Sequence, residues 1–410
     1  MPVAAEIDRA LAIIRRGAES IVSEEDLIHK LERYYRTGEP LRVKLGVDPS
    51  APDIHLGHTV QMRKLRQFQE LGHIVYFVIG DFTGRIGDPS GRSQTRPQLT
   101  EEQVRANART YQEQAYKILD PARTQIVFNN DWLGRLQFAD IVRLASHVTV
   151  ARMLERDDFA KRLGEGHPIS MHELLYPIAQ AYDSIFLRAD VELGGTEQTF
   201  TFTLTRELMR DHGIEPQVFL TMPILVGTDG VNRMSKSLGN YIGIDDPPAE
   251  MMGKVMSLPD NVLLDFYRLV TDVPDTEIQA IKAGMADGTL NPRDAKLRLG
   301  HILVAMYHGE EQAQAAEREF VSVFSEGGLP EDIPEFPVDP ALTGRPVGVV
   351  TLLAQAGLVA SNSEARRLIA QGGVRVDGRR VENVDETVPV YDGLLLQIGR
   401  RRFARVRARR

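Results

Sequence analysis

Two short runs of residues that can bind phosphate lie far apart in this chain. The first, at residues 53–58, is Asp-Ile-His-Leu-Gly-His, and the second, at residues 233–237, is Arg-Met-Ser-Lys-Ser. Imidazole groups and the free N–H groups of a helix N-terminus can converge on phosphate oxygens. Lysine and arginine stabilise charge that develops on a phosphate in a transition state. Together the two runs predict chemistry on a triphosphate.

The surroundings of the first run favour this functional interpretation over a structural one. Taken alone, two histidines could cap a core helix, and the second run could be a solvated basic loop. Residues 41–48 alternate as a strand does, however, and residues 58–71 carry apolar side chains near helical spacing before Gly72. The histidines are therefore predicted to lie where a strand turns into a helix, at the carboxyl edge of a sheet.

The same region predicts the fold class. Residues 74–79 form a continuous apolar run, and a strand, a helix and a buried strand make the βαβ unit of a parallel sheet. Further strands are predicted at residues 125–128, 189–193 and 218–226. We therefore expect an α/β protein with a Rossmann-like, parallel-sheet nucleotide domain at residues 1–245.

The rest of the chain is predicted to form three further segments. Residues 246–326 lack strand signals and form an α-helical domain interrupted by prolines. Residues 327–344 are rich in proline, glycine and acids, which is typical of a linker. Residues 345–410 form a small α+β domain, in which residues 374–381 predict two strands around an Asp-Gly turn.

Charge distinguishes the last domain from the rest. The 410 residues carry a net charge of −8, but residues 361–410 hold 12 arginines and 6 acids. This tail has a net charge of +6, so the preceding 360 residues carry −14. A basic module on an acidic body predicts a nucleic-acid partner for the tail. Its candidate RNA-binding residues are Arg366, Arg367, Arg375, Arg379 and Arg380.

Composition excludes several classes of protein. The chain has no apolar stretch long enough to span a bilayer, and its first residues lack the basic start and apolar core of an export signal. The absence of cysteine removes disulfides, thiolate nucleophiles and cysteine-type zinc sites. We expect a cytoplasmic protein with no membrane partner and no protein-held metal.

A glycine-rich loop at residues 84–96 adds an acid and several arginines after the buried strand. Asp88 could pair with a substrate ammonium, while Arg92 and Arg96 could reach pyrophosphate oxygens. A turn with surface arginines is the structural alternative. In combination with the two phosphate-binding runs, the loop suits amino-acid activation.

A helical face and a second glycine turn complete the candidate pocket. Tyr176, Gln180 and Asp183 recur at spacings of four and three, which places them along one face of a helix. An exposed polar stripe is the usual explanation, but the apolar neighbours indicate a polar pocket within an apolar wall. Residues 194–198, Gly-Gly-Thr-Glu-Gln, could hold ribose and the amino acid from the opposite side. A plain strand–helix turn is the alternative.

The run at residues 53–58 resembles the HIGH signature of class I aminoacyl-tRNA synthetases, and residues 233–237 resemble their KMSKS loop. From about Val43 to the C-terminus the chain is similar to bacterial tyrosyl-tRNA synthetases of the subclass with Gly-Asp-Phe-Thr at residues 80–83. The tail resembles an RNA-binding motif shared with a small-subunit ribosomal protein.

This resemblance implies a two-step reaction and its partners. Tyrosine and ATP would give tyrosyl-adenylate and pyrophosphate, and tyrosine would then pass to the 3′ end of tRNA(Tyr). Alignment and electrostatic stabilisation suffice for such a reaction, so no covalent enzyme intermediate is needed. The resemblance also implies Mg²⁺ bound with ATP, no tightly bound cofactor, and a homodimer.

The resemblance assigns each candidate residue a role. The residues implied to stabilise the transferring phosphate are His55, His58, Arg92, Arg96, Arg233 and Lys236. Those implied to contact ATP are Asp48, Gly57, Gly195, Glu197, Met234, Ser235 and Lys236. Those implied to bind tyrosine are Lys44, Gly46, Asp88, Tyr176, Gln180, Asp183 and Gln198. Within the last set, Asp183 would bind the phenolic hydroxyl and Gln198 would help to orient the carboxylate. The ammonium group would be bound by Asp88, Tyr176 and Gln180.

Three residues depart from the family pattern. Lys44 occupies the position where the better-known subclass has a tyrosine near the substrate hydroxyl, so recognition of that hydroxyl would rest more on Asp183. Glu197 replaces an aspartate and adds a methylene where ribose should lie. Arg233 replaces a lysine, which keeps the charge but changes reach and geometry. Asp81 receives no role.

Three alternatives remain open at this point. A tryptophanyl-tRNA synthetase would share both signature runs, although the basic tail and the helical set around Asp183 oppose it. A synthetase-like RNA-binding protein without charging activity would show eroded catalytic runs, whereas here both histidines and Lys236 are present. A nucleotidyltransferase that adenylates a small acid would leave the basic tail without a role.

Overall fold

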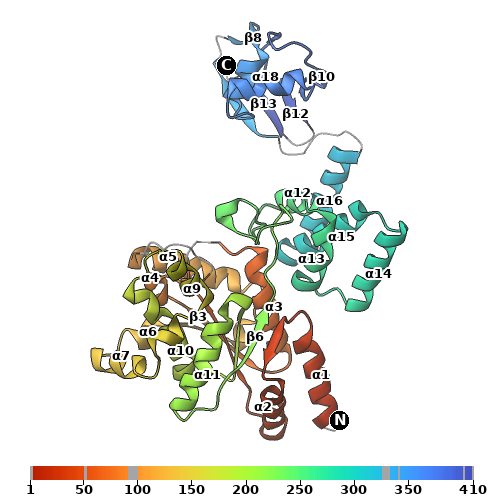
Figure 1. The fold of residues 1–410 in the computed structure, drawn as a ribbon. Helices are drawn as coiled ribbons and strands as arrows, with labels where there is room; N and C mark the ends of the chain where they lie inside the picture. The colour runs from red at the N-terminus through yellow and green to blue at the C-terminus, as the bar shows by residue number, and fades with distance from the viewer. Residues whose placement is uncertain are drawn as a thin grey trace. The chain divides into compact units, whose positions relative to one another are not determined.

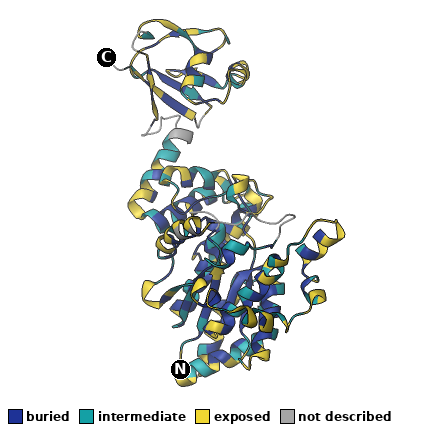
Figure 2. Cartoon of the chain, turned by 90° about the vertical axis from the view of Figure 1, so that its left-hand side faces the viewer, coloured by how far each residue is buried: buried dark blue, intermediate teal, exposed yellow. Residues whose placement is uncertain are grey.

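The computed structural model describes residues 3–49, 53–90, 100–325, 333–339, 342–399 and 402–408. The chain divides into two compact units, Met1–Glu310 and Glu311–Arg410 (Figure 1). Each unit has its own β-sheet, and the buried residues follow the strands of each sheet (Figure 2). Among the described residues, no helix combines the length and apolar character needed to cross a membrane.

The first unit is built around a six-stranded sheet. Its strands are β1 (Ser20–Val22), β2 (Arg42–Val47), β3 (Ile74–Ile79), β4 (Thr124–Phe128), β5 (Val191–Gly195) and β6 (Val218–Met222). Their order is β1-β6-β5-β2-β3-β4, and every neighbouring pair is parallel except β1 and β6. The strands predicted from sequence are confirmed. The sequence pattern misses β1, because a strand of three residues is too short to show alternation.

The strand order opens a crevice between β2 and β5. The chain runs outward from β2 to β3 and β4, and then returns to the other side of β2 to form β5 and β6. The connections after β2 and β5 therefore leave the sheet in opposite directions, which separates them at the carboxyl edge. The first phosphate-binding run follows β2, and residues 194–198 lie at the end of β5. Both candidate segments therefore border the crevice.

Helices cover both faces of this sheet (Figure 1). The longer ones are α1 (Val3–Arg15), α2 (Glu24–Thr37), α3 (Leu56–Glu70), α5 (Glu101–Ala115), α10 (Met171–Leu187) and α11 (Thr199–Asp211). The shorter ones are α4 (Thr83–Ile86), α6 (Asn130–Leu133), α7 (Phe138–Ala145), α8 (Val150–Met153) and α9 (Asp157–Gly164), with 3-10 turns η1 (Pro121–Arg123), η2 (Thr196–Gln198) and η3 (Lys236–Leu238). Lys44 of β2 contacts α10, so its neighbours Val43 and Leu45 face the opposite side of the sheet.

Residues 248–325 contain helices and no strand. They form α12 (Pro248–Met256), the 3-10 turn η4 (Asp260–Val262), α13 (Leu263–Val270), α14 (Asp275–Asp287), α15 (Pro292–His308) and α16 (Glu310–Ser325). Gly300 allows α15 to approach α12 closely, because a Cβ there would lie 2.4 Å from the sulfur of Met252. Arg63 of α3 donates a hydrogen bond to the sulfur of Met306 at 3.0 Å. Helix α15 thus contacts the helix that begins at the histidines and also packs against α12.

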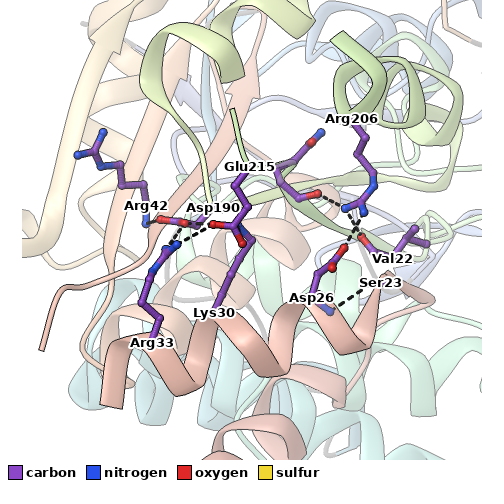
Figure 3. A network of polar contacts seen from close by, with 10 residues as sticks. Val22, Ser23, Asp26, Lys30, Arg33, Arg42, Asp190, Arg206 and Glu215 are labelled. Carbon is purple, nitrogen blue, oxygen red and sulfur yellow. Dashed lines mark hydrogen bonds and ion pairs between the residues drawn. The ribbon is translucent and has the colours of Figure 1, made fainter. Parts of the chain in front are cut away.

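A network of ion pairs holds α2 against the amino end of the sheet (Figure 3). The buried ammonium of Lys30 lies 3.5 Å from Asp190 and 3.1 Å from Glu215, and Arg33 pairs with the same two carboxylates. Asp190 also accepts a hydrogen bond from the backbone N–H of Arg42, at the start of β2, at 2.9 Å. Because removing one partner would leave a buried charge uncompensated, the network fixes α2 at the end opposite the crevice.

In the second unit, the described residues form a five-stranded sheet, a two-stranded sheet and two helices beyond α16. Its strands are β7 (Glu335–Val338), β8 (Pro346–Gly348), β9 (Val374–Val376), β10 (Arg379–Arg380), β11 (Thr387–Pro389), β12 (Leu395–Ile398) and β13 (Arg402–Ala408), and its helices are α17 (Val349–Gln355) and α18 (Asn362–Ala370). The predicted hairpin is confirmed, since β9 and β10 pair in antiparallel orientation. Its central residues Asp377 and Gly378 both have positive φ, 49° and 78°, as in the type I′ turn that matches the twist of the two strands. Within the expected linker, β7 forms a sheet edge by pairing with β13.

Candidate active site

A cavity of about 220 Å³ lies at the carboxyl ends of β2 and β5. The candidate residues that line it are Gly46, Asp48, His58, Asp88, Tyr176, Gln180, Asp183, Gly195, Glu197 and Gln198. Gly46 leaves open space above β2, since a Cβ there would meet nothing within 4 Å. The fold thus brings segments that are remote in sequence to one cavity.

Asp183 lies in this cavity as a buried carboxylate held by two neutral donors. The indole N–H of Trp132 donates to its Oδ1 at 2.7 Å, and the amide of Asn129 donates to its Oδ2 at 3.2 Å. Burial raises the pKa of Asp183 to about 6, although the nearby charge of Lys44 and these hydrogen bonds oppose the rise. A carboxylate of this kind can accept a further hydrogen bond from a buried hydroxyl.

A second set of groups surrounds Asp88. Gln198 donates to Asp88 at 3.1 Å and to Ser90 at 3.0 Å, and the guanidinium of Arg156 donates to the same two residues. The side-chain oxygens of Gln180 and Gln198 are buried without a hydrogen-bond partner among the described residues. A buried acceptor without a donor is costly. The free oxygens of Gln180 and Gln198 line the same cavity as the Asp88 carboxylate, and together these groups suit a bound ammonium group.

Tyr176 and Asp48 contact each other although the resemblance implies separate roles for them. The hydroxyl of Tyr176 donates to Oδ2 of Asp48 at 2.9 Å, and the hydroxyl of Thr83 donates to Oδ1 at 2.7 Å. Gly80 is required beside them, because a Cβ there would lie 2.0 Å from the Asp48 carboxylate. The expected amino-acid and nucleotide contacts are therefore adjacent.

His55 and His58 form a stacked pair at the N-terminus of α3. Their ring centres are 3.8 Å apart. Nδ1 of His55 accepts from the backbone N–H of Gly57, and Nδ1 of His58 accepts from the N–H of His55, both at 3.2 Å. Burial lowers the pKa of His55 to about 2 and that of His58 to about 4, and Lys236 adds to both shifts. Both rings are therefore neutral and carry their proton on Nε2.

The second phosphate-binding run folds onto these histidines. Backbone hydrogen bonds join Leu56 to Ile242 at 2.9 Å and Ile244 to Ile54 at 3.1 Å. This pairing places Lys236 close enough to influence both rings, and its ammonium pairs with Asp53. The two runs, widely separated in sequence, thus present neutral N–H donors and a cation in one region.

The remaining candidates of that run lie nearby but do not line the cavity. Met234 is buried beside Gly57: a Cβ added at Gly57 would lie 3.5 Å from the Cβ of Met234. Ser235 is partly exposed, and Arg233 is exposed but close enough to lower the pKa of Glu197, which burial raises. The carboxylate of Glu197 occupies the space that a side chain at position 195 would need.

One expectation, that for Lys44, differs from the observed placement, and two residues cannot be placed. Lys44 does not line the cavity, because its ammonium is bound beneath it by Gln180, Ser184 and Glu192. Asp81 also lies outside the cavity lining and accepts a hydrogen bond from the backbone N–H of residue 130 at 2.8 Å, at the start of α6. The predicted phosphate-binding residues Arg92 and Arg96 lie outside the described residues.

Sequence reasoning missed three residues that organise the cavity. Asn129 and Trp132 follow β4, so their place beyond a carboxyl strand end was a usable signal. Arg156 carries no such signal, because it comes from the segment between α8 and α9 and reaches Asp88 only through tertiary packing.

A parallel sheet whose crossover helix begins with paired histidines, with a lysine loop folded onto them, defines the class I aminoacyl-tRNA synthetase type. A sequence model of the family described as tRNA synthetases class I (W and Y) matches residues 36–325, and one of the S4 domain matches residues 347–392. The chain belongs to this class I family and, by its relatives, to the tyrosine–tRNA ligases within it.

The relatives cover nearly the whole chain. The tyrosine–tRNA ligase of Moorella thermoacetica is 58% identical over 401 residues, 98% of this chain and 96% of the relative. That of Carboxydothermus hydrogenoformans is 53% identical over 99% of both chains. The solved tyrosyl-tRNA synthetase of Archaeoglobus fulgidus in complex with L-tyrosine is 26% identical, with a TM-score of 0.63 over 76% of this chain and 99% of that one. These relatives favour the tyrosine enzymes over the tryptophan alternative.

Proposed function

We propose that this protein joins tyrosine to tRNA(Tyr) by way of tyrosyl-adenylate. The observation that carries the proposal is one cavity that combines the buried carboxylate of Asp183, the carboxylate of Asp88 with two free amide oxygens, and the neutral imidazole of His58. Asp183 would accept the phenolic hydroxyl, and Asp88 would pair with the ammonium group. Intact residues at these positions favour an active enzyme over a protein that only binds RNA.

Adenylate formation would need positioning and charge stabilisation. A carboxylate oxygen of tyrosine forms a bond to the α-phosphorus of ATP, and the bond from that phosphorus to the bridging oxygen breaks as pyrophosphate leaves. The Nε2–H groups of His55 and His58 would donate to oxygens whose charge grows in the transition state, with Lys236 and Arg233 as cations. Asp48, Gly195 and Glu197 would contact adenosine.

ATP acts here as a substrate and would carry Mg²⁺ with it. Among the described residues, no three histidine, aspartate or glutamate side chains are grouped so that they could hold a metal ion. We propose that the ion is bound mainly by the triphosphate oxygens, as is usual for Mg²⁺ that accompanies a nucleotide. The protein's own residues would bind the amino acid and orient the phosphates.

The second unit would bind tRNA. The side chains of Arg366, Arg367, Arg375, Arg379 and Arg380 are all exposed. They belong to α18 and to the hairpin of β9 and β10. Exposed arginines on rigid elements can pair with RNA phosphates, which gives affinity that falls with salt. Because the relatives are bacterial tyrosine–tRNA ligases, we also propose a cytoplasmic location.

The test separates activation from transfer. The full chain is expected to exchange labelled pyrophosphate into ATP only when tyrosine is present, and to charge tRNA(Tyr). A variant that ends before residue 342 is expected to retain exchange and to charge tRNA more weakly, since it lacks the exposed arginines. Absence of exchange with all twenty amino acids would refute the function, and loss of exchange on truncation would refute the division of labour.

We also propose a homodimer formed through an apolar face of the first unit. The exposed side chains of this face lie on α7, α8 and α10 and are Phe138, Val142, Val150, Met171 and Phe186, with exposed fractions from 52% to 81%. Large exposed apolar patches mark protein interfaces. Light scattering should give twice 45.8 kDa for the full chain and one chain mass for Phe138→Asp. Ile224→Asp, an exposed apolar site elsewhere, should leave the dimer intact, and an unchanged mass for Phe138→Asp would contradict the proposed face.

A further inference from the structure

Lys44 is a fully buried cation in the central strand of the catalytic sheet. Its Nζ donates to Oε1 of Glu192 at 2.8 Å, to the hydroxyl of Ser184 at 2.8 Å and to the backbone oxygen of Gln180 at 3.1 Å. Lys44 and Glu192 are direct neighbours across β2 and β5. The side chain of Lys44 lies on the same face of β2 as Gly46, which lines the cavity. Lys44 therefore lies beneath the cavity, two residues before Gly46 on the same face of the strand.

The two residues of α10 that Lys44 contacts lie on either side of Asp183 in the sequence. Gln180 lies almost one helical turn before Asp183, and Ser184 follows it directly. Two charged groups act on Asp183 in opposite senses: Lys44 from β2 lowers its pKa, and Glu192 from β5 raises it. The groups on the β4 side, Trp132 and Asn129, are neutral donors.

Stability alone gives no reason for this buried pair. Both side chains are at most 1% exposed, and desolvating two charges offsets most of their mutual attraction. Apolar side chains of similar volume would fill the same space at similar or lower free energy. The carboxylate of Glu192 is nevertheless held further by Ser184 at 2.9 Å and Gln217 at 3.1 Å. The pair is thus oriented from several elements, with its cation directed toward the segment that carries Asp183.

We propose that Lys44 and Glu192 are positioning residues that set the charge of Asp183 and so determine selection of the tyrosine hydroxyl. This inference rests on the proposed function, because it requires Asp183 to accept that hydroxyl. Lys44 stabilises the ionised carboxylate from below the cavity, and Glu192 both orients Lys44 and limits its effect. Lys44 acts through Asp183 and does not touch the substrate.

The charge of Asp183 decides how many hydrogen bonds it can accept. When ionised, it accepts from Trp132 and Asn129 and retains a lone pair for a phenol. When protonated, it can only exchange a hydrogen bond between two neutral groups with the phenol, which is weaker than the bond that the ionised carboxylate accepts. Because burial raises its pKa to about 6, tyrosine binding should weaken as the pH falls through about 6. Phenylalanine has no hydroxyl and should not show this dependence.

Opposite charge changes at the two positions should shift this pH profile in opposite directions. The measured quantity is the ratio of the dissociation constants of phenylalanine and tyrosine from pH 5 to 8.5, which cancels titrations that affect both amino acids equally. In Lys44→Met the midpoint should move up by about one pH unit, which weakens tyrosine binding about fivefold at pH 6. In Glu192→Gln the midpoint should move down. Lys44→Arg keeps the positive charge, so its midpoint should lie closer to the wild-type value than that of Lys44→Met.

The outcomes separate this inference from the function on which it rests. If the wild-type protein does not bind tyrosine, the proposed function fails. If it binds tyrosine with a midpoint near pH 6, but Lys44→Met and Glu192→Gln shift that midpoint in the same direction or not at all, only the inference fails. General damage to packing would weaken tyrosine and phenylalanine alike and leave the midpoint in place. Should Lys44→Met fail to fold, the downward shift in Glu192→Gln alone decides, because loss of packing does not lower a midpoint.

Discussion

Replacing His58 with alanine is expected to lower kcat for tyrosine-dependent pyrophosphate exchange by about 10²–10³-fold. His58 lines the cavity, and its neutral ring presents Nε2–H because Nδ1 already accepts the N–H of His55. A donor of this kind interacts more strongly with the transition state, in which phosphate charge grows, than with bound substrates. The loss should therefore appear in kcat, with little change in KM for tyrosine.

The pH profile provides an independent check of this role. The folded-state pKa values of His55 and His58 are lowered to about 2 and about 4, so both rings should stay neutral from pH 5 upward. In that range neither ring should produce a break in kcat. The matched control is His29→Ala, an exposed histidine on α2, which should leave kcat unchanged. A kcat break near pH 6.5 that disappears in His58→Ala would show that the ring acts as an acid or base instead.

Replacing Asp183 with asparagine is expected to reduce kcat/KM for tyrosine by about 10–100-fold and to leave kcat/KM for phenylalanine nearly unchanged. The variant keeps the side-chain volume but loses the charge. Trp132 and Asn129 each donate to one oxygen of Asp183, so in the variant the amide NH₂ group must face one of these two donors. A site built to bind a hydroxyl rejects the analogue that lacks it, and tyrosyl-tRNA synthetases are themselves a standard example of this effect. Parallel exchange assays with the two amino acids measure the change.

A second carboxylate near the same strand ends serves as the control for Asp183. Asp81 lies outside the cavity lining and bonds to the backbone at the start of α6. Asp81→Asn should therefore preserve the tyrosine-to-phenylalanine ratio even if it lowers stability. An equal loss of selectivity in both variants would mean that α6, and not the charge of Asp183, controls recognition.

Local patterns were sufficient to predict the sheet and the face of α10 that lines the cavity. Strands such as β3 carry continuous apolar runs, and spacings of four and three place Tyr176, Gln180 and Asp183 on one helical face whatever surrounds it. The same reasoning failed for β1, which is defined by its pairing with β6 and not by a pattern of its own. Short elements depend on contacts that sequence periodicity does not show.

The position of Lys44 illustrates a different limit. The family resemblance implied that Lys44 contacts tyrosine, and alternation along β2 places its side chain on the face of the strand where Gly46 borders the cavity. Only the packed structure shows that Glu192, adjacent across β5, binds the ammonium first and keeps it beneath the cavity. A neighbour on another strand cannot be read from the strand itself.

The sequence by itself determined which residues are chemically suited to bind phosphate and tyrosine, because residue type and short-range spacing set local geometry. Tertiary structure alone decided that the His55 ring and Lys236 meet, since the pairing of Leu56 with Ile242 closes that distance. It also decided that Asp183 is buried between Trp132 and Asn129. Burial and long-range pairing depend on how separate segments pack, and these set the protonation states on which the proposed chemistry depends.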